Sequence, residues 1–369
     1  MELTDRLGIS PRIAILAWIV VGLLGGLSGV FAMLLSSYLL TFGGRDEASK
    51  HGISEVVATR VGGVVVVSYT AFFLSYQYQL GRLFIPEQGW MVLVPATAFF
   101  IVGLYEDLKA SLSSRWRFIL MSLIALMALI WFPKMNLQEV GIPLLDMLLS
   151  YELVAFLFTA ACLAFIPNAF NTADGANGLI SGTSIVALYG LSHAMPTEAS
   201  LYLNTVIVGC AVFLVFNLAS GRFFLGDGGA YFLGAFCGVT LILCSNTTDA
   251  STWWMLSLVF YPLADLLWSM ARRVLAGRSP MEPDNQHLHN LVNAIIKGNG
   301  RCDYWANTST GMGIVFCFGG IPLAIQLGAS IPLDSTIWGA VVAVQWAAYA
   351  LLWLFLNKRV CTIQRLDGT

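Results

Sequence analysis

Long apolar runs dominate the chain, and its polar residues gather in the short stretches between those runs. A hydrocarbon core about 30 Å thick needs roughly 20 apolar residues as an α-helix. The runs are continuous rather than alternating, which argues against a membrane β-barrel. The sequence therefore predicts an all-α polytopic membrane protein with about eleven spans, at residues 13–42, 61–80, 90–105, 117–133, 151–167, 179–195, 200–221, 229–246, 253–271, 310–329 and 336–357.

The composition supports this class. Apolar residues make up 57% of the 369 residues, and charged residues only 11%. Ordinary soluble domains carry about 25% charged residues, so we expect an integral membrane protein surrounded by lipid. We interpret residues 1–369 as one membrane domain. Nothing in the pattern indicates a nucleic-acid partner, and the formal net charge of −2 adds little.

Lysine and arginine residues are distributed unequally between the two sides of the predicted spans. The side reached after odd-numbered spans, together with the C-terminal tail, carries 15 of the 19 residues, and the other side carries 4. Cytoplasmic loops of membrane proteins are enriched in these cations. The sequence therefore predicts an N-terminus outside the cell and a cytoplasmic C-terminus.

The polar motifs all fall on the predicted cytoplasmic side. A transporter is expected to place polar groups near the bilayer midplane, in broken helices. Here the spans are almost free of charge, with the exception of Asp265 near the cytoplasmic end of its span. This pattern favours a site built from cytoplasmic loops, where a cytosolic solute meets a lipid headgroup. A lipid-linked sugar flippase without transferase activity is the alternative hypothesis.

The segment 168–179 is the most polar of these motifs. It holds three asparagines, Asp174 and two glycines directly between two apolar runs. Carboxylates can bind a hard cation, and glycines let the backbone approach a phosphate. The structural alternative is a helix C-cap, an Asx-turn and a helix N-cap in series.

Two other motifs combine charges with helix ends. His51 and Arg60 precede a glycine pair that opens a span, which is compatible with a phosphate site or simply with cytoplasmic loop charge. Glu106 and Asp107 are adjacent at the end of a span, where they need a cation or a basic partner. A solvated helix end paired with Lys109 or Arg115 is the alternative.

The remaining two motifs follow later spans. Asp227 lies among glycines, shortly after Asn217, so a metal ion and a large polyanion could both reach its carboxylate; a flexible turn is the alternative. Arg278, His287 and His289 lie in the longest cytoplasmic loop. Their histidine spacing is not that of a helical zinc pair, and such a set suits a diphosphate or, alternatively, anionic lipid.

Together these motifs resemble the polyprenyl-phosphate N-acetylhexosamine-1-phosphate transferases of glycosyltransferase family 4. This family includes the phospho-MurNAc-pentapeptide translocase and the enzymes that start O-antigen synthesis. The resemblance runs from Asp46 to about His289. It rests on Asp46, His51, Arg60, Gly62 and Gly63; on Glu106 and Asp107; on Asn168, Asn171, Asp174, Gly175, Asn177 and Gly178; on Phe224, Gly226, Asp227 and Gly229; and on Pro283, Asp284, His287 and His289.

The sequence departs from the family pattern at four positions. Glu106 replaces the first aspartate of a pair, and Asn177 replaces the second acid of the central motif. Asn285 and Asn290 replace an arginine and a histidine of the last motif. We interpret the chain as a subfamily variant that retains activity, because the three principal aspartates remain.

The resemblance implies transfer of N-acetylhexosamine 1-phosphate from a UDP-sugar to undecaprenyl phosphate, with release of UMP and a requirement for Mg²⁺ or Mn²⁺. It implies catalytic roles for Asp107, Glu106 and Asp174, metal binding by Asp227 and Asp107, and substrate binding by His51, Arg60, Asn168, Asn171, Asn177, Asn217, Arg278, His287 and His289. A phosphate monoester is already mostly dianionic at pH 7, so a general base matters little. We favour direct displacement over an aspartyl-phosphate intermediate.

The family further implies a multi-pass protein of the bacterial inner membrane that acts at the first membrane step of O-antigen, capsule or other envelope polysaccharide synthesis. GlcNAc, its 6-deoxy derivatives and FucNAc all stay open as the transferred sugar. The sequence also leaves a homodimer open.

Overall fold

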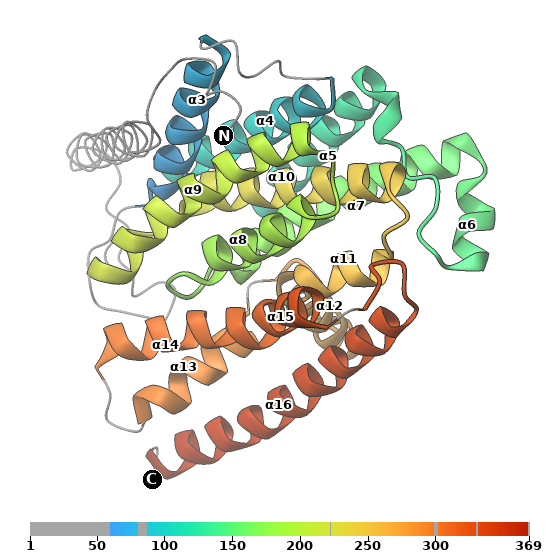
Figure 1. Ribbon diagram of the computed structural model, residues 1–369. Helices are drawn as coiled ribbons and strands as arrows, with labels where there is room; N and C mark the ends of the chain where they lie inside the picture. Colours follow the sequence, from blue (N-terminus) through green and yellow to red (C-terminus); the bar gives the residue numbers. More distant parts are fainter. Residues whose placement is uncertain are drawn as a thin grey trace.

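The computed structural model describes residues 60–79, 87–221, 223–282, 284–298, 302–329 and 331–367. These residues form a bundle of helices (Figure 1). The predicted first span, 13–42, and the candidate site residue His51 lie outside the described residues.

The helices follow one another with short connections. In chain order they are α3 (Gly62–Gln79), α4 (Glu87–Lys109), α5 (Ser114–Trp131), the 3₁₀ turn η2 (Pro133–Met135), α6 (Pro143–Leu149), α7 (Glu152–Ala173), α8 (Leu179–Ser192), α9 (Thr197–Ser220), α10 (Gly226–Thr247), α11 (Thr252–Leu258), α12 (Phe260–Leu275), α13 (Leu288–Gly298), α14 (Asp303–Val315), the π-helical turn η3 (Phe316–Gly320), α15 (Ile321–Gly328) and α16 (Ile337–Asp367).

The helix α10 is the centre of the bundle. It packs against α3, α4, α7 and α8, and 94% of its apolar segment is buried. Figure 1 shows it running between α4 and α7, with α13 to α16 forming a separate group beside the bundle. Small residues, including several glycines in its first half, let its neighbours approach closely. The most buried helix therefore carries Asp227 at its beginning.

Every predicted span after the first coincides with a helix or a broken helix. By length and composition, seven helices among the described residues could cross a membrane, or up to eight if a bent pair counts as one span. The helix α8 has only 14 residues, and α3 is not among the seven. The chain is thus a multi-pass helical membrane protein, and the count of eleven stays a prediction.

Two predicted spans are interrupted. The span 253–271 is divided at Val259 into α11 and α12, which bend by 85°. The span 310–329 begins earlier, at Asp303, and contains the π-helical turn η3. Uniform hydropathy does not reveal such breaks, because they depend on partners that satisfy the irregular backbone.

One side chain of α16 supports both irregularities. The amide Nε2 of Gln345 donates to Ser257 O at 3.0 Å and to Phe318 O at 2.8 Å. Ser257 lies two residues before the α11–α12 break, and Phe318 lies inside η3. In an apolar interior a polar group without a partner is costly, so Gln345 stabilises the two breaks together.

We expect Gln345→Leu to lower the free energy of unfolding by about 1–3 kcal/mol, because two buried carbonyls lose a donor. The measurement is thermal unfolding of the purified protein in detergent. Val344→Leu, at the neighbouring exposed position, is the control and should leave the melting temperature unchanged. Equal melting of the two variants would contradict this role of Gln345.

Candidate active site

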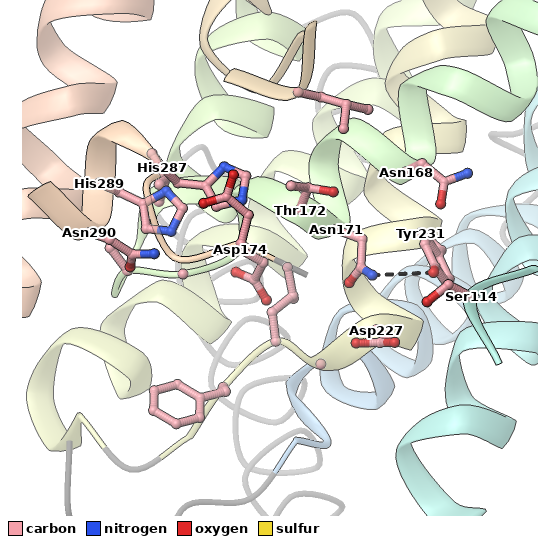
Figure 2. Close-up of a pocket in the computed structure, with 18 of the residues that line it drawn as sticks. Ser114, Asn168, Asn171, Thr172, Asp174, Asp227, Tyr231, His287, His289 and Asn290 are labelled. Atoms are coloured by element: carbon pink, nitrogen blue, oxygen red, sulfur yellow. Dashed lines mark hydrogen bonds between the residues drawn. The ribbon is translucent and has the colours of Figure 1, made fainter. Parts of the chain in front are cut away.

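A cavity of about 690 Å³ lies where several helix ends meet. Glu106 comes from the end of α4, Arg117 from the start of α5, and Asp174 from the end of α7. Asp227 comes from the start of α10, and His289 from the start of α13. Figure 2 shows the histidines and Asp174 on one side of this cavity, and Asp227, Asn171 and Tyr231 on the other. The predicted motifs, which are far apart in sequence, therefore converge.

Asp107 anchors the start of α10. Its Oδ1 accepts a hydrogen bond from Asp227 N at 2.9 Å, and its Oδ2 accepts one from Gly228 N at 2.8 Å. The first N–H groups of a helix have no partner within the helix. A carboxylate at this end also interacts favourably with the positive end of the helix dipole. Asp107 does not line the cavity itself. Its clearest role is to position Asp227.

The glycines around this start permit close backbone contact. Gly226 has a φ of +78°, in the left-handed region that favours glycine. A side chain there would also lie 2.1 Å from Arg60 O. Gly62 N and Gly63 N donate to Phe224 O and Leu225 O at 2.9 and 2.8 Å. The two glycines, which the sequence suggested as part of a phosphate site, thus form hydrogen bonds with the protein backbone. Among the described residues of that motif, Arg60 alone lines the cavity.

Asp227 carries an ion pair that the motifs do not include. Its Oδ2 accepts from Arg117 Nη1 at 2.6 Å, and the two side chains are 17% and 22% exposed. In the sequence, Arg117 is one of the 15 lysine and arginine residues on the predicted cytoplasmic side and belongs to none of the motifs. Nearby, Glu106 Oε2 accepts from Leu112 N at 2.9 Å, which fixes the turn between α4 and α5. The glutamate at this position therefore has a structural partner as well as a place in the cavity.

Asp174 is the C-cap of α7 and is buried beside the other charged groups. Burial, and then the carboxylate of Asp227, raise the pKa of Asp174 to about 7 against the opposing effect of Arg60. Asn171, one turn earlier, donates through Nδ2 to the hydroxyl of Tyr231 on α10 at 3.2 Å (Figure 2). Asn168 donates to Ala164 O at 2.8 Å and lines the cavity too. Tyr231 is a cavity residue that the sequence did not predict, since only its contact with α7 identifies it.

The two histidines are held by α12. His287 Nδ1 lies 2.7 Å from Asp265 Oδ2, and the other oxygen of Asp265 accepts from Leu288 N at 3.1 Å. Tyr349 of α16 also donates to Asp265, at 2.7 Å. Asp265, the charged residue noted inside a predicted span, therefore fixes the beginning of α13 from a fully buried position.

His289 is stacked on His287, with ring centroids 5.5 Å apart, and its Nδ1 lies 2.9 Å from Tyr261 Oη. Burial lowers the pKa of His289 to about 4. A Cβ on Gly175 would lie 2.1 Å from His289 Nε2. The glycine that follows Asp174 is therefore required for the close approach of this imidazole to the central motif.

Two further predicted site residues, Asn177 and Arg278, do not line the cavity, whereas Asn217 does. Asn177 is 3% exposed and does not line the cavity; its N donates to Asn307 Oδ1 at 2.6 Å, and its Nδ2 to Thr308 Oγ1 at 3.2 Å. It thus joins the central motif to α14. Arg278 is exposed and does not line the cavity. Asn217 lines the cavity and donates to Phe223 O at 2.6 Å.

The donor set around Asp227 fits a magnesium ion that is completed by other oxygens. Among the described residues, no group of three or more His, Cys, Asp and Glu side chains is arranged to hold a metal alone. Mg²⁺ usually takes one or two carboxylates together with water and substrate phosphates. Asp227, with Glu106 and Asp174 along the same cavity, supplies such carboxylates. The ion pair with the guanidinium of Arg117 shows that the carboxylate of Asp227 binds a cationic group.

Known proteins resemble the chain in sequence. A family model described as Glycosyl transferase family 4 matches residues 89–245, which include α4 to α10. The probable undecaprenyl-phosphate N-acetylglucosaminyl 1-phosphate transferase of Bacillus subtilis (strain 168) is 24% identical over 273 residues, covering 72% of this chain and 74% of that protein. The undecaprenyl-phosphate alpha-N-acetylglucosaminyl 1-phosphate transferase of Salmonella typhi is 28% identical over 297 residues, covering 73% and 77%. The decaprenyl-phosphate N-acetylglucosaminephosphotransferase of Mycobacterium leprae is 26% identical over 266 residues, covering 63% and 66%.

Gly175→Ala should displace His289 and lower the free energy of unfolding by about 1–3 kcal/mol, as overpacking of a filled site does. Thermal unfolding in detergent measures the effect. Gly313→Ala is the matched control, because a Cβ at that helical position meets nothing within 4 Å. If both variants melted alike, the contact between Gly175 and His289 would not constrain the fold.

Acidification should lower the free energy of unfolding, because His289 is protonated more readily in the unfolded chain than in the folded one. Its folded pKa of about 4 lies below the unfolded value near 6.5. Between these values the unfolded chain binds more protons, so the free energy of unfolding decreases as the pH falls through this window, by roughly 3 kcal/mol. His289→Gln should weaken the dependence, measured as melting temperature between pH 7 and 4. His193→Gln, at an exposed histidine, should keep the wild-type dependence; a slope unchanged in His289→Gln would oppose the interpretation.

Proposed function

The chain is a member of glycosyl transferase family 4, and we propose that it transfers N-acetylhexosamine 1-phosphate from a UDP-sugar to undecaprenyl phosphate and releases UMP. The reaction starts the synthesis of a lipid-linked glycan. The observation that carries the proposal is the convergence of acidic, basic and amide side chains in one cavity, whose carboxylates Glu106, Asp174 and Asp227 lie within the region that matches the family. The names of the relatives favour UDP-GlcNAc as the donor.

Charge is the main obstacle to this reaction. An oxygen of the lipid phosphate attacks the β-phosphorus of the UDP-sugar, the bond from that phosphorus to the bridging oxygen breaks, and UMP leaves with that oxygen. Both reactants are anionic, so catalysis consists mostly of positioning and charge stabilisation. Arg60 and Arg117 supply positive charge in the cavity. A bound Mg²⁺, held by Asp227, would neutralise charge on the diphosphate and the leaving UMP.

Other groups of the cavity are placed to hold the donor substrate. His287 and His289 lie at the N-terminal end of α13, and both line the cavity. Asp174 and Asn171 lie between these histidines and Asp227 (Figure 2). We propose that the diphosphate extends from the histidines toward Asp227, with the sugar near the central motif.

Direct displacement is the proposed course. The hydrogen bonds from α10 occupy both oxygens of Asp107, which supports a positioning role over nucleophilic attack. The second pKa of a phosphate monoester is near about 6, so the lipid phosphate needs little help from a base at neutral pH. Glu106 and Asp174, which line the cavity, orient the reacting phosphates.

The lipid would approach through the apolar part of the cavity. Phe118, Phe165 and Met270 line it together with the polar groups, which suits a polyprenyl chain beside its phosphate. We propose the predicted eleven-span topology in the bacterial inner membrane, with the cavity on the cytoplasmic side. The distribution of lysine and arginine supports this orientation.

The test is release of UMP by the purified protein in detergent, with undecaprenyl phosphate, Mg²⁺ and a panel of UDP-HexNAc donors. We expect UDP-GlcNAc to be used, Asp227→Asn to reduce the rate by about 10²–10³-fold, and EDTA to abolish it. Asp249→Asn, at an exposed aspartate beyond the other end of α10, is the matched control and should retain the rate. No UMP from any donor, in a folded protein, would overturn the proposal and favour the flippase hypothesis.

A further inference from the structure

The ion pair between Arg117 and Asp227 has a feature that an ordinary structural pair lacks. The guanidinium contacts Asp227 Oδ2 at 2.6 Å, but its Nε is buried without a hydrogen-bond partner among the described residues. Its Nη2 makes only a 3.4 Å contact with Ser114 Oγ. Arg117 therefore depends on Asp227 for its principal interaction, and its guanidinium is incompletely satisfied.

The two partners differ in freedom. Asp227 is fixed, because Asp107 accepts a hydrogen bond from its backbone N–H and from that of the next residue. Arg117 extends a long side chain from the first turn of α5, and that side chain is partly exposed. If another cation reaches Asp227, Arg117 is the group that can move.

We propose that Arg117 competes with the divalent cation for the carboxylate of Asp227 and so sets the affinity of the metal site. This inference rests on the proposed function, which places the metal ion at Asp227. The motifs assign no role to Arg117. In the structure its guanidinium forms an ion pair with Asp227, and this is the contact that a divalent cation would displace.

The surrounding charges make such a neutralising group necessary. Glu106 and Asp174 also line the cavity, and Asp107 lies directly behind Asp227. Carboxylates so close together repel one another in a partly dehydrated site. Arg60 and Arg117 are the guanidinium groups that offset them electrostatically among the described residues near Asp227. Removing Arg117 takes away the competitor for the carboxylate of Asp227. It also takes away a positive charge beside the incoming cation, and both changes favour metal binding.

The experiment measures Mn²⁺ binding directly, without turnover. The purified full-length protein in detergent is titrated with Mn²⁺, and the free ion is quantified by electron paramagnetic resonance. We expect Arg117→Gln to bind Mn²⁺ about tenfold more tightly than the wild type, because a unit charge adjacent to the site is lost. Arg117→Lys retains the charge with a shorter reach and should give an intermediate affinity.

Arg115→Gln is the matched control, because it removes the same charge from an exposed position on the same helix. It should bind Mn²⁺ as the wild type does. Asp227→Asn identifies the signal that belongs to this site and should lose it. Melting curves of each variant establish that it is folded, and Arg117→Lys supplies the comparison if Arg117→Gln does not fold.

The outcomes separate the inference from the proposed function. One outcome is that Mn²⁺ binding depends on Asp227 while neither Arg117 variant binds the ion more tightly than Arg115→Gln does. In that case the proposed competition between Arg117 and the cation is wrong, and the proposed function stands. If no binding depends on Asp227 in any of the proteins, the competition is overturned together with the metal site, and UMP release then decides the transferase activity independently.

Discussion

The two hydrogen bonds from the backbone of α10 to Asp107 are the interaction on which the candidate active site depends. The most buried helix of the bundle begins here, and its first N–H groups have no partners of their own in the helix. The carboxylate of Asp107 on α4 accepts hydrogen bonds from two of these groups and so joins the two helices. Because Asp227 is one of the two residues bonded, the same contact that orders the bundle also positions the carboxylate proposed to bind metal.

Placing acidic groups beside this helix start creates a charge problem. Burial, and then the nearby carboxylate of Asp227, raise the pKa of Asp174 to about 7. Arg117 of α5 and Arg60, which precedes α3, offset part of this charge. A site with unneutralised carboxylates suits a reaction in which a divalent cation and anionic substrates arrive together. The repulsion among these carboxylates is thus the counterpart of the proposed chemistry of the cavity.

The C-terminal helices are joined to this core by buried polar side chains rather than by apolar packing alone. Asp265 holds the start of α13, Asn177 joins the central motif to α14, and Gln345 joins α16 to two backbone breaks. Hydrogen bonds are specific in direction and distance, so they determine how the helices are oriented where apolar surfaces allow sliding. This explains why the histidines, which come late in the chain, lie beside Asp174.

The amino-acid sequence alone determined the helical membrane class and most of the polar residues of the cavity, because hydropathy and motif chemistry are local properties. Asp227, Asp174 and His287 were predicted in this way, and they line one cavity. Only the tertiary structure decided which residues are partners over long separations. The pairing of Arg117 with Asp227, 110 residues apart, is one such case. The break at Val259 is another, since the 85° bend between α11 and α12 has no counterpart in the hydropathy pattern. Asn177 is a third, because its neighbours in sequence predict a place in the cavity, whereas its contacts with α14 bury it between helices.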